Sequence, residues 1–163
     1  MMIAVVGCGI SPVGAGLGSE IDGHDLVIRA NRAYDTAGKE HDWGRRTDIL
    51  CVGHEAAIRR LVMPPPFEVI YVKDVWRSYW PHDRKPLAGT FAALHAVKMG
   101  ARKVTLYGID LYADATYSSG RWNCPTVFKG HPGGPPHHKF DIRPDRDALL
   151  NLPCKVEWRL RRL

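Results

Sequence analysis

Residues 3–11 read Ile-Ala-Val-Val-Gly-Cys-Gly-Ile-Ser, and this stretch decides the fold. The short apolar run from Ile3 to Val6 ends at Gly7, which is typical of a buried strand followed by a tight turn. Further glycines follow, so the backbone after the strand has room to approach a ligand closely. An open α/β sheet presents nucleotide sites in this way, at the carboxyl ends of its strands. The stretch therefore predicts the first strand of such a sheet.

The rest of the chain alternates predicted strands with predicted helices. Short apolar runs predict strands at residues 25–29, 47–52, 67–72, 104–107 and 155–160. Helical spacing or composition predicts helices at residues 54–62, 89–99 and 143–151. Without a repeat or a linker, this order favours one Rossmann-like α/β domain over residues 1–163, with a mostly parallel sheet and helices on both faces. Residues 113–136 are rich in Gly, Pro, Ser and Asn, which predicts a long loop that is functional or disordered.

Composition narrows the class of protein. The 163-residue chain carries a formal net charge of +6, which suits an anionic ligand such as a nucleotide or an acidic sugar. A nucleic-acid partner has weaker support, from the net charge and the basic run at residues 159–162, and we expect none. No stretch reaches the ~20 apolar residues of a membrane span, and the N-terminus lacks a charged leader region. We therefore expect a soluble, cytoplasmic protein without a membrane span.

The four cysteines do not form a metal-binding pattern. Cys51 and His54 make a lone C-x-x-H without a second pair nearby, so we expect no zinc site and reduced thiols. The D-x-D sequence at residues 145–147 places two carboxylates in a pattern that can hold a divalent cation. Its place in the first turn of a predicted helix has a simpler explanation, because carboxylates favour helix N-termini. We therefore predict no metal.

The glycine turn departs from a dinucleotide fingerprint. The third glycine of G-x-G-x-x-G falls on Pro12, and the second strand is followed by Asn31 instead of an acidic residue. What remains is a turn suited to phosphate or ribose, beside an amide that can both donate and accept hydrogen bonds. Asn31 is alternatively a turn residue that ends a strand.

Several segments resemble sialyltransferases. Residues 14–33 with 43–47 are similar to the long sialylmotif of glycosyltransferase family 29, joining E-I-D-x-H-D to R-x-N and G-x-R-T. Residues 86–108 are similar to its short motif. Residues 106–112, with Tyr117 and His137, resemble the bacterial sialyltransferases of family 42. The resemblance implies a GT-A-like variant of the Rossmann fold and an inverting, metal-independent transferase without a cofactor. Such an enzyme moves sialic acid or a related keto-sugar acid from a CMP-sugar donor to a glycan or small-molecule acceptor.

The same resemblance implies roles for individual residues. The glycine turns and their neighbours would bind the phosphate and ribose of the donor, and Asn31 would contact the nucleotide. The start of the helix after residue 88 would lie near the cytidine. A tyrosine pair would hold the leaving phosphate. The implied substrate-binding residues are Gly7, Cys8, Gly9, Ser11, Asn31, Gly89, Thr90, Gly108, Asp110, Tyr112 and Tyr117. The implied catalytic residues are His137, His138 and Asp141, with His137 or His138 as general base.

The chemistry also has support from residue types alone. An inverting transfer needs a base with a pKa near 7, and histidine has one. Without metal, hydrogen-bond donors and helix N-termini must stabilise the leaving phosphate. A solvated His-Pro-Gly loop remains the alternative for the histidines. A catalytically degenerate nucleotide-binding module also stays open, because Cys8, Leu87 and Ala88 replace residues usual in the motifs. Trp76, Tyr79 and Trp80 are expected in the core, with stacking on a sugar as the alternative.

Overall fold

The structure is a computed structural model that describes residues 1–58, 61, 64–109 and 143–159. Six strands form one sheet in the order β4-β3-β2-β1-β5-β6. Their bounds are β1 (Met2–Val6), β2 (Leu26–Ala30), β3 (Ile49–Val52), β4 (Glu68–Tyr71), β5 (Lys103–Tyr107) and β6 (Lys155–Arg159). Every neighbouring pair is parallel, so the predicted α/β class is confirmed with a sheet that is parallel throughout.

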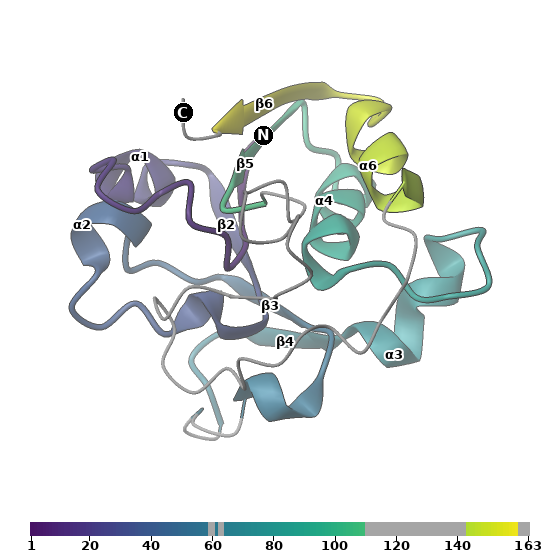
Figure 1. The fold of residues 1–163 in the computed structure, drawn as a ribbon, viewed down its shortest axis with the longest axis horizontal. Coiled ribbons are helices and arrows are strands. Elements are labelled where there is room, and N and C mark those ends of the chain that lie inside the picture. Colours follow the sequence, from purple (N-terminus) through teal and green to yellow (C-terminus); the bar gives the residue numbers. More distant parts are fainter. Residues whose placement is uncertain (59–60, 62–63, 110–142, 160–163) are drawn as a thin grey trace, which may run out of the picture.

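Helices cover both faces of the sheet, as predicted. The α-helices are α1 (Gly18–Asp22), α2 (Glu40–Trp43), α3 (Val72–Val75), α4 (Ala88–Lys98) and α6 (Arg143–Leu150), and the 3₁₀ turns are η1 (Asn31–Tyr34), η2 (Glu55–Ile58) and η3 (Trp76–Ser78). Figure 1 shows α4 and α6 on one side of the strands and α1 and α2 on the other. The two longest helices, α4 and α6, therefore share a face.

Strand β1 shows why the sheet needs both layers. Ile3 and Val5 belong to the core cluster that includes Phe91 of α4, whereas Val6 packs in the second cluster with Trp43 of α2. Residues Ile3 to Val6 are fully buried. A strand buried on both faces reads as a continuous apolar run, which is why the sequence identified it.

The predicted helices and loops differ from the structure in detail. Gly18 begins α1, where a continuous glycine loop was expected from residue 7, and α2 was not expected. Both helices have at most five residues, too few to produce a helical period in the sequence. Within the helix predicted at 54–62, the described residues form the 3₁₀ turn η2. The end of α4 was predicted correctly, since Gly100 follows it with φ of +85°.

The strand order reverses at one place in the sheet, and the term crevice denotes here the region outside the carboxyl ends of β1 and β5. The chain moves outward from β1 to β4 and then returns through α4 to β5, which pairs with the other side of β1. Strand order thus reverses between β1 and β5, and their outgoing connections diverge. Ligands of open α/β sheets bind at this kind of point, outside the carboxyl ends of the strands.

Candidate nucleotide-binding site

Two glycine turns meet where β1 and β5 end. Gly7 donates its N–H to the Tyr107 carbonyl at 2.8 Å, and Gly9 donates to the Gly108 carbonyl at 2.8 Å. A Cβ on Gly7 would lie 2.5 Å from the Gly108 carbonyl oxygen, and Gly108 has φ of +60°. Only glycine fits this backbone approach, so the two turns form a fixed floor for the crevice.

Ser11 and Cys8 lie beside this floor. Ser11 is 5 % exposed, and its hydroxyl accepts the N–H of Gly108 at 3.1 Å. The half-buried thiol of Cys8 lies 3.5 Å from the Ala30 carbonyl, so Cys8 bridges the ends of β1 and β2. Ser11 therefore has a structural role in joining the two turns, while its contact with a ligand stays a prediction.

Asp42, which sequence reasoning missed, holds the next part of the glycine loop. Its carboxylate accepts the N–H groups of Gly14 at 2.7 Å and Gly16 at 2.9 Å. Desolvation acts to raise the pKa of Asp42, but these two donors outweigh it and hold the pKa below its ordinary value. The carboxylate of Asp42 thus holds the glycine loop against α2, and no local sequence pattern predicts such a long-range contact.

Asn31 ends β2 in an unusual conformation. Among the described residues it is the one non-glycine residue with φ in the left-handed region, at +52°. Its side-chain oxygen accepts the N–H of Gly53 at 2.8 Å. Asparagine tolerates this φ better than most residues, so the sequence interpretation as a turn residue fits. Because the oxygen is already bound, the amide offers its NH₂ group as a hydrogen-bond donor.

The start of α4 lies over the ends of these strands. A Cβ on Gly53 would lie 3.2 Å from Cβ of Ala88, and one on Gly89 would lie 2.6 Å from Cδ1 of Ile109. Thr90 is fully buried, and its hydroxyl has no hydrogen-bond partner. Gly89 and Thr90 therefore occupy the first turn of a helix beside the crevice, where they were predicted. First-turn N–H groups lack partners within the helix and favour anions.

A buried carboxylate fixes this helix start. Asp145 of α6 is fully buried, forms an ion pair with Arg84, and accepts the N–H of Leu87 at 2.8 Å. The first carboxylate of the D-x-D sequence thus joins α6 to the segment before α4. This role supports the helix-terminus interpretation of the motif over a metal site. Within the described ranges, no group of three or more His, Cys, Asp or Glu side chains could hold a metal ion.

Arg29 is a buried cation beneath the crevice. Its guanidinium donates to the carbonyls of Arg46 at 2.8 Å, Ala33 at 3.1 Å and Trp43 at 2.7 Å. Burial lowers the pKa of Arg29 to about 10, although Asp22, Asp48 and Cys8 act in the opposite direction. These three hydrogen bonds hold the backbone of residues 33–46 and thereby position Trp43. The Trp43 ring lies so near Gly108 that a Cβ added there would be 3.1 Å from it.

The remaining predicted site residues cannot be placed. Asp110, Tyr112, Tyr117, His137, His138 and Asp141 lie outside the described residues. The described part of the candidate site therefore runs from the glycine turns to the start of α4, and its binding of a nucleotide stays a prediction.

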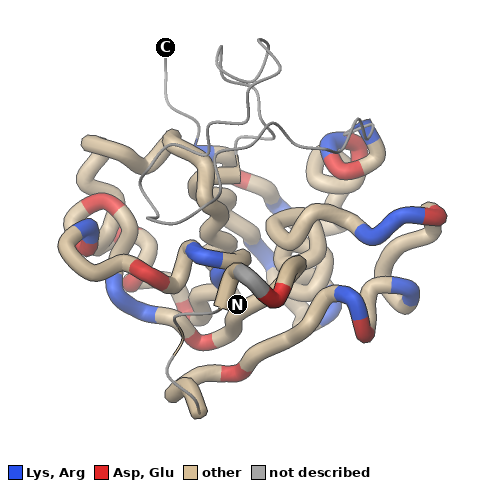
Figure 2. Tube along the Cα trace, turned by 60° about the horizontal axis from the view of Figure 1, so that its bottom comes forward, with Lys and Arg blue, Asp and Glu red and all other residues tan. Residues whose placement is uncertain are grey.

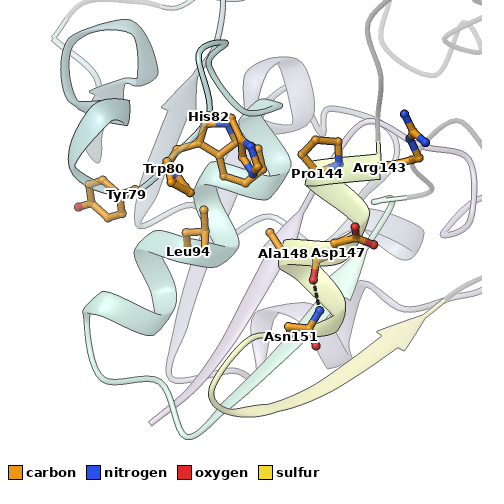
Figure 3. A pocket seen from close by; sticks show the side chains of 10 residues that line it. Tyr79, Trp80, His82, Leu94, Arg143, Pro144, Asp147, Ala148 and Asn151 are labelled. Carbon is orange, nitrogen blue, oxygen red and sulfur yellow. Dashed lines mark hydrogen bonds between the residues drawn. The ribbon is translucent and has the colours of Figure 1, made fainter.

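A hollow lies between the segment before α4 and helices α4 and α6. Figure 3 shows Trp80, His82 and Leu94 on one side of it, and Asp147 and Ala148 on the other. Its volume is about 560 Å³. Trp80 is 4 % exposed, so its ring packs in the protein, as expected, and offers little surface to a sugar.

Charged residues of both signs occur along the part of the chain that the structure describes. Figure 2 shows Lys and Arg interspersed with Asp and Glu along the described chain. A nucleic-acid interface usually gathers basic residues on one face. No helix of the described part is both long enough and apolar enough to cross a bilayer.

Comparisons with known proteins agree with this geometry. Residues 3–68 match the family model of glycosyltransferase family 29 (sialyltransferase). The fold is similar to the crystal structure of a mammalian sialyltransferase, with a TM-score of 0.62 and 20 % identity over 99 % of this chain and 69 % of that one. A mammalian sialyltransferase in complex with Gal-β-1-3GalNAc-ortho-nitrophenol is also similar, with a TM-score of 0.60 and 21 % identity over 99 % and 70 % of the two chains. A search of curated proteins found no match.

Proposed function

We propose that this chain, which shares the fold of mammalian sialyltransferases and matches the sialyltransferase family model over residues 3–68, transfers sialic acid or a related keto-sugar acid from a CMP-sugar to a glycan hydroxyl with inversion. The observation that carries the proposal is the reversal of strand order between β1 and β5, with the amide of Asn31 at the end of the adjacent strand β2. A nucleotide bound there meets a glycine floor and the start of α4. These are the features that suit phosphate and ribose.

The orientation of the Asn31 amide indicates how the nucleotide would be recognised. Its oxygen is bound to Gly53, so the NH₂ group is the part available to a ligand. An NH₂ donor suits a phosphate oxygen, a ribose oxygen or the carbonyl of a pyrimidine ring. In the proposed complex Asn31 therefore donates to the nucleotide.

The chemical step would come from residues beyond the described ranges. We assign the general base to His137 or His138, with Asp141 as its partner, and the leaving phosphate to Tyr112 and Tyr117. Histidine supports this assignment because its unperturbed pKa lies near the operating pH, and base catalysis contributes typically ~10² to 10⁴-fold. The base removes the acceptor proton as the acceptor oxygen attacks the anomeric carbon and CMP leaves.

We further propose that the transfer needs no metal. The leaving phosphate would be stabilised by hydrogen-bond donors and the first turn of α4, which can replace a divalent cation. The engagement of Asp145 with Arg84 and Leu87 supports this view, because it removes one carboxylate of the D-x-D sequence from metal binding.

The testing experiment is calorimetric titration with CMP, using UMP, ADP and NAD as controls, followed by assay of transfer from CMP-sialic acid. Selective binding of CMP together with turnover supports the proposal. Replacement His137→Ala or His138→Ala should abolish transfer with nucleotide affinity nearly unchanged. Binding of another nucleotide in preference to CMP would overturn the proposed donor.

A degenerate nucleotide-binding module is the second candidate. The observation that favours it is Cys8, a partly exposed thiol in the turn where the related families usually carry an asparagine. A thiol is a weaker hydrogen-bond donor than an amide. Selective binding of CMP without transfer to any glycan acceptor would favour the module over the enzyme.

A further inference from the structure

Two adjacent basic residues precede α4, and the structure uses them differently. Arg84 forms an ion pair with the fully buried carboxylate of Asp145, so its charge is neutralised inside the protein. Lys85 is exposed, and among the described carboxylates none forms an ion pair with it. Its ammonium group donates to the carbonyl of Gly53 at 2.7 Å. Lys85 therefore presents a positioned charge to solvent.

The position of that charge is the carboxyl end of β3. Gly53 follows β3 directly and makes two contacts, since its N–H is bound to Asn31 and its carbonyl to Lys85. The amide of Asn31 and the ammonium of Lys85 are thus held by one residue, next to the start of α4. Lysine is ordinarily a mobile side chain, and its hydrogen bond to a carbonyl restricts where the charge lies.

The surroundings of this pair favour an anion. Lys85 has donor capacity beyond its one bond to Gly53, because an ammonium group carries three N–H donors. Asn31 has its NH₂ group available, and the first-turn N–H groups of α4 lie nearby. The neighbouring carboxylate of Glu55 is paired with Lys73 instead. Gly53 thus brings the Lys85 ammonium and the Asn31 amide together beside the start of α4, and no carboxylate of the described residues forms an ion pair with Lys85.

We propose that Lys85 and Asn31 form an anion subsite at the ends of β2 and β3 that binds a negatively charged group of the donor. The proposal rests on the proposed function and names a residue beyond it. The shared chemistry is an oxyanion, which is either the nucleotide phosphate or the carboxylate of the transferred keto-sugar acid. Lys85 is a substrate-contacting specificity residue in this assignment.

The test compares three ligands on the wild-type protein and three variants. Cytidine, CMP and CMP-sialic acid are titrated calorimetrically into the wild-type protein, Lys85→Met and Lys98→Met. Lys98→Met is the matched control, because it removes the same charge at the C-terminal end of α4, away from the segment that carries Lys85. Lys85→Arg, which keeps the charge, should restore most of the affinity. We expect Lys85→Met to weaken an anionic ligand by about tenfold and to leave cytidine unchanged.

The ligand pattern distinguishes the two anions. An equal loss for CMP and CMP-sialic acid assigns the phosphate to Lys85, whereas a loss confined to CMP-sialic acid assigns the carboxylate. Unchanged affinities in Lys85→Met, with wild-type protein that binds CMP, overturn the subsite alone. An equal loss for cytidine also overturns it, because cytidine lacks an anion. Wild-type protein that binds none of the three ligands overturns both the subsite and the proposed function.

Discussion

The side-chain oxygen of Asn31 accepts the backbone N–H of Gly53 at 2.8 Å, and this contact decides which half of the amide faces outward. The contact also joins the ends of β2 and β3, since Asn31 follows one strand and Gly53 the other. A residue that ends a strand thereby becomes an oriented hydrogen-bond donor.

Replacement Asn31→Asp separates the structural and ligand-binding halves of this side chain. Aspartate keeps an oxygen acceptor for Gly53 and also tolerates the left-handed φ, so unfolding free energy should change by less than about 0.5 kcal/mol. The NH₂ donor is lost and a negative charge appears, so CMP affinity should fall by about tenfold or more. Calorimetry and thermal denaturation measure the two quantities.

Asn31→Ala is the control for that experiment, because alanine loses both the acceptor and the tolerance for positive φ. It should lower the unfolding free energy by about 1–3 kcal/mol. Undiminished CMP binding by Asn31→Asp would show that the amide does not donate to the nucleotide.

Gly108→Ala tests the glycine floor of the crevice. Its φ of +60° disfavours alanine, and the new Cβ would lie 2.8 Å from the Gly7 carbonyl oxygen. Strain and overpacking together should lower the unfolding free energy by about 3 kcal/mol or more. Gly14→Ala is the matched control, since Gly14 has φ of +72° but no neighbour within 4 Å of the added Cβ. Its cost should be about 1 kcal/mol. Equal costs in denaturant titration would refute the clash.

The fold was largely predictable because its strands are apolar runs with glycine or proline boundaries. The run at Ile3 to Val6 and the α4 terminus at Gly100 are local signals, and both predictions were confirmed. The helices α1 and α2 were missed because a single turn has no periodic pattern.

The site was less predictable because its organising contacts join distant segments. Asp42 holds the loop at Gly14 and Gly16 from 26 or more residues away, and Asp145 caps the segment before α4 from 58 residues away. Nothing local distinguishes these carboxylates from solvated ones. The sequence placed Asn31 in the site but could not show that its oxygen is bound.

Stability should depend on pH through His95. Its Nδ1 lies 2.9 Å from the Tyr79 hydroxyl, and its ring stacks on Phe91. Burial lowers the pKa of His95, Lys98 acts in the same direction, and Glu68 opposes both. The unfolded chain therefore binds this proton more readily than the folded one. The contribution of His95 to the free energy of unfolding is therefore fully present above the pKa of histidine in the unfolded chain, near 6.5. It is lost as the pH falls through the lower pKa of the folded state.

His95→Gln provides the comparison for this pH dependence. Because His95 is about half buried, its contribution should be below about 1 kcal/mol. Melting temperatures of both proteins between about pH 5 and 7.5 measure it, and the wild-type protein should lose more stability toward pH 5. Parallel profiles would exclude His95 as the source.

Cys8, which follows β1, and Cys51, which lies within β3, should react at different rates with a thiol reagent. Cys51 is fully buried, and burial raises the pKa of its thiol, so the native protein should protect it from alkylation. Cys8 is partly exposed at the glycine turn and should be modified first. If CMP binds the crevice, a saturating concentration should slow modification of Cys8 by about tenfold or more, as mass spectrometry of the labelled peptides would measure. UMP at equal concentration is the control. Slowed labelling of Cys51 without an effect on Cys8 would instead indicate global stabilisation by a ligand bound elsewhere.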